Sequence, residues 1–284
     1  MNPDVFAPVE VPAEFSPFFR RVMVAHCNEQ VSFDVTVRGT GYCYLGWTPS
    51  GRWCGAVNSE VEFDSDVDGR LHLSGQVYNG HVEGHFSGIL RQIFCEFTAL
   101  GQYEFLGIEG SATFEKAINP CAEAACMSKV RALLEEGGAP ESSKELANVF
   151  FAALREAEPE RRAPEYLHQL VARLEDAGDV KTFSELLRDM GVSERKARDD
   201  FSRIVGLTPK RFSKLLQINA AFSGLMSLKK NRLADLAAEC GFSDQAHMTR
   251  SFVEFLGNSP VQFGNDIEPT LKRFVGHSRN QSKS

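Results

Sequence analysis

The feature that most constrains the fold of this chain is a degenerate repeat within residues 179–264. The first copy reads SELLRDMGVS and ends at Ser193, and the second reads ADLAAECGFS and ends at Ser243. The matching Gly and Ser residues of the two copies lie 50 positions apart, whereas the matching Phe, Gly and Pro residues that follow them lie 51 positions apart. The second copy therefore has one extra residue in its second helix or in the turn before it.

Each copy predicts two helices joined by a tight turn. A glycine takes a positive φ without a Cβ penalty, so Gly191 and Gly241 are each expected to end a helix. Ser193 and Ser243 are then expected to cap the next helix by accepting a backbone N–H. A three-residue joint of this kind is the helix-turn-helix motif. The alternative, an all-α core with coincidental symmetry, is disfavoured because the motif occurs twice.

A capping box and a long helix frame the two copies. Thr182 and Glu185 have capping-box spacing before the first copy. Between the copies, Thr208-Pro209 is an N-cap followed by proline at the first helical position, so a long helix begins there. One side of this helix is expected to be buried between the two helix pairs, and its residues are Phe212, Leu215, Leu216, Asn219, Phe222 and Met226.

Charge is distributed unevenly along the chain. Residues 1–178 contain 26 acidic side chains against 14 Lys and Arg, whereas residues 179–284 contain 12 against 17. A basic C-terminal part beside an acidic remainder indicates that the C-terminal part meets a polyanion. Together with the repeat, this predicts binding to double-stranded DNA.

The predicted fold class is α+β and multidomain. Short strand candidates separated by turn signals, such as Val31–Val37 and Ile93–Thr98, predict a β-rich, barrel-like N-terminal domain. A helix is predicted over Cys121–Glu136, ended by Gly137–Gly138, and further apolar residues at helical spacing follow it. The predicted order is a β-rich sensor or dimerisation domain (1–120), a helical linker (121–177), an all-α domain with two helix-turn-helix motifs (178–268) and a disordered tail (269–284).

Several classes of protein are excluded by composition. No run of about 18 apolar residues occurs, so we expect no transmembrane helix and no membrane partner. The acidic, proline-rich start differs from a secretory signal. Seven scattered Cys residues without a CxxC pair argue against a disulfide framework or a zinc knuckle. We therefore expect a cytoplasmic protein.

The second copy resembles the AraC family of bacterial transcription regulators. The string CGFSDQAHMTRSFVEFLGNSP is similar to the family signature nearly residue for residue, and VGLTPKRFSKLLQINAA is similar to the pattern around the connecting helix. LSGQV and EFTALGQYEFLGI resemble the sensor-type domain of one uncharacterised branch of the family. The resemblance implies two helix-turn-helix motifs joined by a long helix, and regulation of transcription.

Base contacts follow from the resemblance. The second helix of each motif should enter the major groove of DNA. In the second copy, Met248, Phe252 and Phe255 are spaced to face the core, and His247 is expected to be a packing residue. The base-contact candidates are Gln245, Ala246, Thr249 and Arg250. Gln can bond adenine and Arg can bond guanine bidentately.

The first copy departs from the family pattern. Its matching positions are Arg195, Arg198 and Asp199, and the family usually has Arg where Asp199 stands. Asp199 and Asp200 would repel phosphates, although a carboxylate can accept from cytosine N4. The base-contact candidates that remain are Arg195 and Arg198.

Four basic residues are candidates for contacts with DNA phosphates: Lys210, Arg211, Lys214 and Arg232. Such contacts set the register and the salt dependence of binding rather than the choice of sequence. The alternative for each of them is a solvated surface charge.

The N-terminal part is expected to sense a small molecule or to form a homodimer, because these are the roles of N-terminal domains in the family. Its aromatic residues line a pocket or, more commonly, fill a core. They are Trp47, Trp53, Tyr42, Tyr44, Phe86 and Phe97.

The segment His81-x-Glu83-x-His85 carries residue types that bind transition metals. Gly80 and Gly84 predict a loop here, so we expect no metal site. His81, Glu83 and His85 are the candidate ligands of the alternative, a metal-binding protein. No nucleophile elbow, phosphate loop or dinucleotide fingerprint occurs. We therefore expect neither a cofactor nor an enzymatic activity.

The sequence predicts an AraC-type, sequence-specific DNA-binding transcription regulator, an activator or a repressor, controlled by a small molecule or a partner at its N-terminal domain. Two alternatives stay open. One is an interaction protein with a decayed DNA-binding face, which Asp199 and Asp200 suggest. The other is a metal- or ligand-binding barrel protein with a fused helical domain.

Overall fold

The computed structural model describes residues 6–38, 41–57, 61–78, 81–176, 182–227, 233–256 and 259–260. The chain divides into two compact units. The first unit comprises Met1–Ala163 with the short segment Arg203–Gly206, and the second comprises Pro164–Ser202 and Leu207–Ser284. The tail predicted over residues 269–284 lies outside the described residues.

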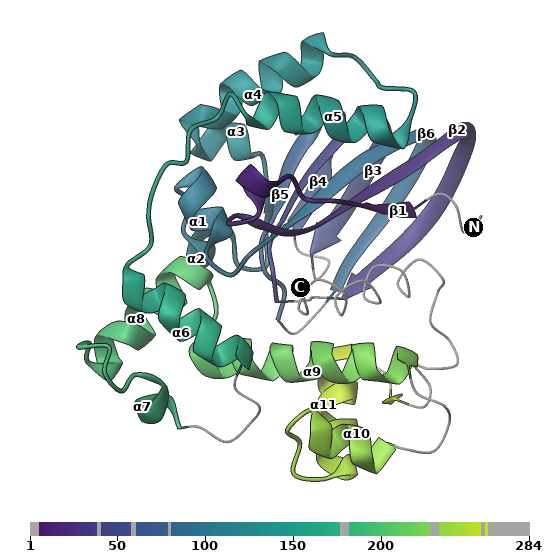
Figure 1. Ribbon diagram of the computed structural model, residues 1–284. Coiled ribbons are helices and arrows are strands. Elements are labelled where there is room, and N and C mark those ends of the chain that lie inside the picture. Colours follow the sequence, from purple (N-terminus) through teal and green to yellow (C-terminus); the bar gives the residue numbers. More distant parts are fainter. Residues whose placement is uncertain are drawn as a thin grey trace. The chain divides into compact units, whose positions relative to one another are not determined.

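The first unit is built on an antiparallel sheet with the strand order β1-β2-β6-β3-β5-β7, and β4 pairs with β3 beside this path. Its strands are β1 (Phe6–Val9), β2 (Phe19–Arg38), β3 (Tyr44–Val57), β4 (Val61–Asp64), β5 (Leu71–Ser74), β6 (His81–Phe97) and β7 (Ala117–Ile118). The long strands β2, β3 and β6 curve together (Figure 1). The predicted α+β class is confirmed, and the sheet is barrel-like only in a loose sense because it does not close within the described residues.

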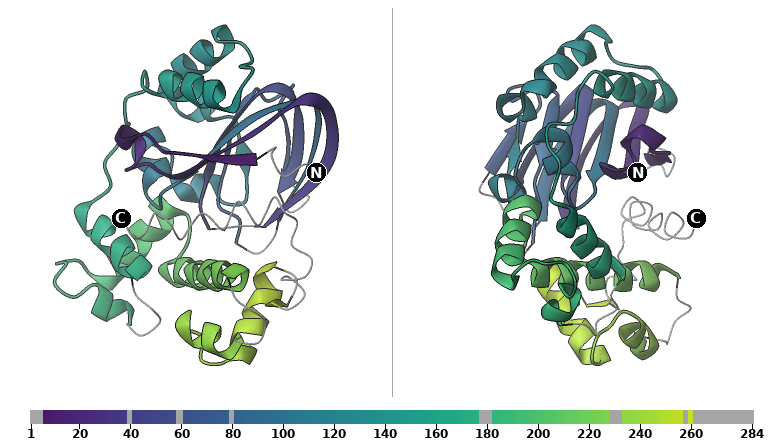
Figure 2. Two further views of the ribbon diagram at one scale, coloured as in Figure 1. Left: turned by 45° about the vertical axis from the view of Figure 1, so that its right-hand side comes forward. Right: turned by 60° about the vertical axis from the view of Figure 1, so that its left-hand side comes forward.

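Helices cover one face of this sheet (Figure 2). They are α1 (Gly101–Leu106), α2 (Gly110–Thr113), α3 (Pro120–Glu123), α4 (Ala125–Glu136) and α5 (Ser143–Leu154), and the 3₁₀ turn η2 (Ala13–Phe15) precedes β2. Alternate residues of the central strands, such as Leu45 and Ile93, are fully buried against Phe150 and Leu146 of α5 in one core. Trp47 stacks on Phe150 with ring centroids 6.0 Å apart.

The expected helix from Cys121 to Glu136 is interrupted. Ala124 has extended dihedral angles (φ −126°, ψ 115°) and separates α3 from α4. Its methyl group is buried in the core under the sheet, so tertiary packing overrides the strong helix propensity of alanine. Of the helices within segment 121–177, α4 and α5 belong to the first unit and α6 to the second.

The second unit is helical in its described residues. Its helices are α6 (Glu165–Asp176), α7 (Phe183–Leu186), α8 (Glu194–Val205, of which the last three residues belong to the first unit), α9 (Pro209–Ser227), α10 (Leu233–Glu239) and α11 (Gln245–Leu256). The long α9 contacts α6 and also α10 and α11. No helix in the described segments is both long and apolar enough to span a bilayer.

His72 of β5 is an imidazole buried without a charge partner. Its ring lies between Phe63 and Phe94, with centroid distances of 5.0 and 6.4 Å. Its Nδ1 has no hydrogen-bond partner among the described residues. Burial lowers the pKa of His72 to about 4, so the ring is neutral at physiological pH.

This burial makes the stability of the first unit depend on pH. Below pH 6.5 the unfolded chain takes up a proton at His72, whereas the folded chain does not until about pH 4. We predict that acidification from pH 7.5 to pH 5 lowers the free energy of unfolding by about 2 kcal/mol through His72. Urea unfolding at both pH values measures this loss. The His72→Leu variant is the control, and its free energy of unfolding should fall by about 2 kcal/mol less than that of the unmodified chain. Equal losses of free energy in the two proteins would contradict the prediction.

Candidate nucleic-acid interface

The first helix-turn-helix motif begins with the capping box that the sequence predicts. Thr182 Oγ1 accepts a hydrogen bond from the Glu185 backbone N–H at 3.3 Å. The Glu185 carboxylate in turn accepts one from the Thr182 backbone N–H at 2.7 Å. This pair fixes the start of α7.

The end of α7 differs from the prediction. The helix stops at Leu186 instead of continuing to Gly191, because Asp189 has a φ of 70°, which a right-handed helix cannot contain. Arg173 of α6 donates to the carbonyl oxygens of Leu186 and Arg188 at 2.7 and 3.0 Å. The guanidinium therefore satisfies carbonyl groups that the short helix leaves open.

The second motif turns its corner at a glycine, as predicted. Gly241 has a φ of 75°. Its N–H donates to the Ala238 carbonyl at 3.1 Å, and the Phe242 N–H donates to the Ala237 carbonyl at 2.8 Å. These two bonds form a Schellman motif. Phe242 is 4% exposed, so the corner is also closed by an apolar side chain.

The extra residue of the second copy lies in the turn. In the first copy, Ser193 Oγ accepts from the Lys196 backbone N–H at 3.3 Å, as predicted. The predicted cap by Ser243 is wrong, because Asp244 Oδ1 accepts from the His247 backbone N–H at 2.6 Å. This hydrogen bond lowers the pKa of the Asp244 carboxyl. The insertion thus moves the N-cap of α11 by one residue.

Helix α9 joins the two motifs and is buried on more than the predicted side. Phe212, Leu215 and Phe222 are buried as expected. Ile218 and Ala221 are equally buried, whereas Leu216 and Asn219 are half-buried. The side chain of Met226 lies outside the described residues. α6 and the α10–α11 pair both contact α9, so the helix needs apolar residues around a wider arc than one stripe.

Helix α11 presents a sharply divided surface. Met248, Phe252 and Phe255 are 0%, 0% and 4% exposed, which confirms the predicted core face. Gln245, Ala246 and Arg250 are exposed, and Thr249 is half-buried with its hydroxyl donating to the Gln245 carbonyl at 2.9 Å. The four base-contact candidates of the second motif therefore share one outward-facing surface.

One further residue, which is not among the candidates predicted from the sequence, belongs to this surface. Val253 is 48% exposed and follows Ala246 by seven residues, so it lies on the same side of α11 two turns later. The helical spacing alone would have identified it. An exposed aliphatic side chain in this position is suited to contact a thymine methyl group.

Helix α8 has a different surface, on which the basic residues Arg195, Lys196 and Arg198 each have an acidic partner one turn away. Arg198 pairs with Glu194 at 3.2 Å, Arg195 with Asp199 at 3.9 Å and Lys196 with Asp200 at 2.6 Å. Arg198 also lies over the ring of Phe183, with 4.2 Å between the guanidinium carbon and the ring centroid. The charges of these three pairs on α8 therefore cancel.

Asp200 and Asp199 have separate roles. The Asp200 side chain is 13% exposed and accepts a hydrogen bond from the Tyr166 hydroxyl of α6. It therefore connects α6 with α8 inside the second unit. The Asp199 side chain is 73% exposed, so the predicted repulsion of phosphates concerns Asp199.

The phosphate-contact candidates fall into three environments. Lys210 and Arg211 are exposed at the start of α9, where Thr208 Oγ1 accepts from the Arg211 backbone N–H at 3.3 Å. Lys214 is half-buried, with its Nζ 3.2 Å from His247 Nε2 and 4.8 Å from the centroid of the Phe242 ring. Arg232 lies outside the described residues.

His247 is a packing residue in the second corner, as expected. Its ring meets Phe242 edge-on with centroids 5.5 Å apart, and its Nδ1 lies 3.1 Å from Ser243 Oγ. With Lys214 at Nε2, the imidazole connects α9, the turn and the start of α11. It therefore helps to hold the outward surface of α11 in place.

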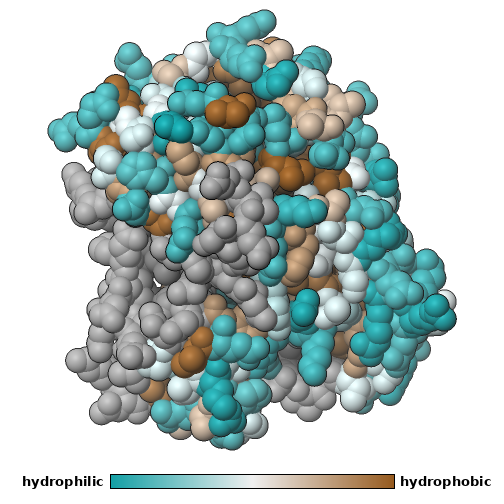
Figure 3. Space-filling view, turned by 180° about the vertical axis from the view of Figure 1, so that it is seen from behind, coloured by the Kyte–Doolittle hydropathy of each residue, from teal (hydrophilic) through white to brown (hydrophobic). Residues whose placement is uncertain are grey.

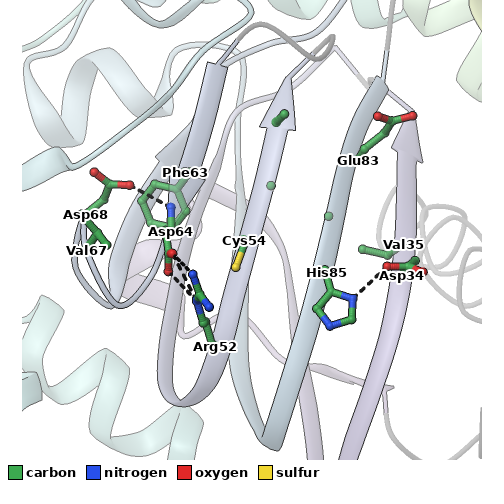
Figure 4. A pocket seen from close by; sticks show the side chains of 13 residues that line it. Asp34, Val35, Arg52, Cys54, Phe63, Asp64, Val67, Asp68, Glu83 and His85 are labelled. Atoms are coloured by element: carbon green, nitrogen blue, oxygen red, sulfur yellow. Dashed lines mark hydrogen bonds and ion pairs between the residues drawn. The ribbon is translucent and has the colours of Figure 1, made fainter.

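A groove of about 860 Å³, lined by both apolar and charged side chains, lies on the sheet of the first unit. Figure 4 shows His85 of β6 and Asp34 of β2 side by side, and the atoms His85 Nδ1 and Asp34 Oδ1 are 2.8 Å apart. On the other side, Arg52 forms an ion pair with Asp64. The Asp64 carboxylate at the groove is thus neutralised from within the sheet.

The predicted loop at His81–His85 is wrong, because these residues lie on β6 and pair with Arg38–Asp34 of β2. Gly84 is needed for packing rather than for a turn, since a Cβ there would lie 2.0 Å from the Trp53 ring. Glu83 and His85 line the groove, and the side chain of His81 lies outside the described residues. Among the described residues, no three His, Cys, Asp or Glu side chains are grouped as metal ligands.

The aromatic residues of the first unit act mainly as core. Tyr42, Trp47, Phe86 and Phe97 are at most 3% exposed. The half-buried Tyr44 donates its hydroxyl hydrogen to Glu96, whose buried carboxylate also accepts from Arg21 at 2.7 Å. Trp53 packs beside Phe86 in a smaller cluster.

All seven cysteines are free. Burial raises the pKa of the Cys43 thiol to about 12 and that of Cys126 to about 11. These thiols are therefore protonated and unreactive at neutral pH.

Comparisons with known proteins point to one domain family. Residues 186–266 match the family described as a helix-turn-helix domain. A sequence comparison with curated proteins gave no match.

Solved structures of ToxT from Vibrio cholerae are similar to this chain. A structure in the P21 crystal form is 12% identical, covers 87% of this chain and 98% of its own, and has a TM-score of 0.44. ToxT bound to (E)-4-(8-methylnaphthalen-1-yl)but-3-enoic acid is 10% identical, with coverage of 85% and 97% and a TM-score of 0.44. Wild-type ToxT bound to an unsaturated fatty acid is 9% identical, with coverage of 84% and 96% and a TM-score of 0.42.

The left-handed backbone at Gly241 predicts a stability effect. The Gly241→Ala variant forces a Cβ into that conformation, which costs about 1–2 kcal/mol. We expect the unfolding midpoint of the second unit in urea to fall accordingly. The matched control is Gly241→Asn, which should lose less because asparagine tolerates positive φ. Equal stability of Gly241→Ala and the unmodified chain would contradict the observed turn.

Proposed function

We propose that this chain is a DNA-binding transcription regulator, and that the sequence specificity of its helix-turn-helix domain (residues 186–266) comes mainly from α11. The observation that carries the proposal is the divided surface of this helix. Three buried side chains fix its rotation about its axis, and Gln245, Ala246 and Arg250 are left exposed near its N-terminus. Base-reading helices present their N-terminal residues to the major groove in this way.

The chemistry of this surface suits direct reading of bases. Gln245 can bond adenine bidentately and Arg250 can bond guanine bidentately. Ala246 and Val253 present small aliphatic groups that suit the methyl group of thymine. The surface therefore combines two hydrogen-bonding side chains with two apolar ones.

Helix α8 is proposed to bind DNA with little choice of sequence. Its basic side chains Arg195, Lys196 and Arg198 are each paired with a carboxylate on the same helix. Such pairs must be broken before a guanidinium can reach a base edge. Lys210 and Arg211 are proposed to contact phosphates, which sets register rather than specificity.

Replacement of Arg250 tests base reading by α11. We predict that Arg250→Ala weakens binding to the cognate site by about 5- to 150-fold, because a bidentate contact with guanine contributes about 1–3 kcal/mol. Binding to random duplex DNA should fall much less. Fluorescence anisotropy titrations with both duplexes measure the two effects. Arg195→Ala is the matched control on α8 and should weaken binding to the cognate duplex and to the random duplex by similar factors. If Arg250→Ala also weakened binding to the two duplexes equally, base reading by Arg250 would be refuted.

The acidic residue on α8 provides a second test. We predict that Asp199→Asn strengthens binding to random duplex DNA by about two- to fivefold at low salt, because it removes a negative charge and releases Arg195. The gain should shrink as salt increases. Glu239→Gln on α10, also exposed, controls for a change in net charge. An unchanged affinity would show that α8 does not approach DNA.

A salt titration separates this function from the interaction protein with a decayed DNA-binding face. Each phosphate contact lowers the slope of log K against log salt by about 0.9. A steep slope supports the regulator. Absence of binding to any duplex at low salt would favour the interaction protein, for which the neutralised surface of α8 would be the structural sign.

We also propose that the first unit controls DNA binding through a small molecule, and that the protein is cytoplasmic and non-catalytic. Support for a ligand comes from Thr48 Oγ1 and Gln92 Nε2, which are buried without a hydrogen-bond partner among the described residues. Buried polar atoms of this kind call for a water or ligand partner. Native mass spectrometry of the purified chain tests for a retained molecule, which Gln92→Leu should release.

A further inference from the structure

Lys214 differs from the other basic residues at the start of α9. Hydrophilic side chains cover much of the surface shown in Figure 3, and the exposed Lys210 and Arg211 are ordinary in this respect. Lys214 is half-buried, with its Nζ 3.2 Å from His247 Nε2. The same Nζ lies 4.8 Å from the centroid of the Phe242 ring. Its ammonium group is therefore held at the corner of the second motif.

The contact with Lys214 decides how the His247 ring carries its hydrogen. An ammonium group has three donors and no acceptor, so Nε2 must offer its lone pair. In a neutral imidazole the hydrogen then lies on Nδ1. The Ser243 hydroxyl oxygen, 3.1 Å from Nδ1, accepts this hydrogen, whereas the Ser243 backbone nitrogen is farther from Nδ1, at 3.4 Å. The imidazole thus links Lys214 to the turn through two directed hydrogen bonds.

Helix α9 reaches the same corner at a second point. Gln217 follows Lys214 by three residues, so both side chains lie on one side of α9. The Gln217 amide donates to the Gly241 carbonyl oxygen at 3.2 Å. Gly241 follows α10, and His247 lies in the first turn of α11. Two side chains one turn apart on α9 therefore hold both sides of the corner.

These contacts act on the turn of α11 that carries two of the proposed base-reading residues. Gln245 and Ala246 directly precede His247 at the start of the helix. The buried side chains that fix the rotation of α11 begin only at Met248. The first turn of α11 is therefore placed by its contacts with the corner, which are the hydrogen bond to Asp244 Oδ1 and the link from His247 to α9.

We propose that Lys214 is a positioning residue for base reading by α11, and that it acts through His247 instead of contacting a phosphate. An ammonium group that turned toward a phosphate would give up its hydrogen bond to Nε2 and its place beside the Phe242 ring. Hydrogen bonds that involve a charged group are about twice as strong as neutral ones, so the corner competes with a phosphate for this group. The inference rests on the proposed reading of bases by α11, and it replaces the phosphate contact predicted for Lys214 from the sequence.

Replacement of Lys214 by methionine separates the two roles. Lys214→Met keeps an unbranched apolar stem and removes the ammonium group. Binding to a duplex that the unmodified chain selects from a random library should weaken about 5- to 30-fold, which is part of the loss expected for one bidentate base contact. Binding to random duplex DNA should stay within about twofold, and the slope of log K against log salt should not change. Fluorescence anisotropy titrations of the full chain at several salt concentrations measure these quantities.

Matched variants identify the partner of Lys214. Lys210→Met, one turn earlier on α9, should weaken binding to both duplexes by similar factors and make the salt slope shallower by about 0.9, as the loss of one phosphate contact does. His247→Leu should reproduce the effect of Lys214→Met, and the double variant should lose no more than either single variant. His247→Gln retains an acceptor oxygen for the ammonium group and should recover most of the selectivity that His247→Leu loses.

The proposal is overturned if Lys214→Met weakens binding to both duplexes equally and makes the salt slope shallower by about 0.9, because Lys214 would then contact a phosphate. It is also overturned if the losses of Lys214→Met and His247→Leu add in the double variant, or if His247→Gln behaves as His247→Leu does. Arg250→Ala, measured beside these variants, separates the inference from the proposed function. If only Arg250→Ala lowers the ratio of the two affinities, the role of Lys214 is wrong; if no variant lowers it, base reading by α11 is wrong as well.

Discussion

The burial of one face of α11 is the constraint from which the functional surface of this protein follows. Met248, Phe252 and Phe255 are almost completely removed from solvent, and α9 and α10 contact the helix. Burial of such side chains contributes about 1.5–3 kcal/mol each, which fixes the rotation of the helix about its axis. The rotation of α11 therefore exposes Gln245, Ala246 and Arg250 together. Packing of the buried face thus decides which side chains the exposed face presents.

The two copies of the motif have the same frame and different surfaces. Ala197 and Met248 stand at equivalent positions, and both are fully buried. The exposed residues around them have diverged, because three basic side chains of α8 form ion pairs with carboxylates one turn away, whereas the start of α11 exposes Gln245 and Ala246. The two copies thus share a buried core, whereas the exposed residues of α8 and α11 differ in charge pairing.

Sequence reasoning succeeded where local rules decide the structure. The glycine corner at Gly241, the capping box at Thr182 and the buried stripe of α11 each depend on a few neighbouring residues. It failed where tertiary contacts decide. Gly84 suggested a loop, although it makes room for Trp53 within a strand. Ala124 suggested a continuous helix, although core packing breaks it. The role of Asp200 depended on Tyr166, a residue 34 positions away on α6.

Selection of bound sequences from a random duplex library most directly tests the claim that α11 reads bases. The unmodified chain should select a motif, and Gln245→Ala should lose selectivity at one or two adjacent positions while the remainder of the motif is retained. Arg195→Ala on α8 should leave the selected motif unchanged. If Gln245→Ala selected the unaltered motif and Arg195→Ala lost part of it, the assignment of base reading to α11 would be contradicted.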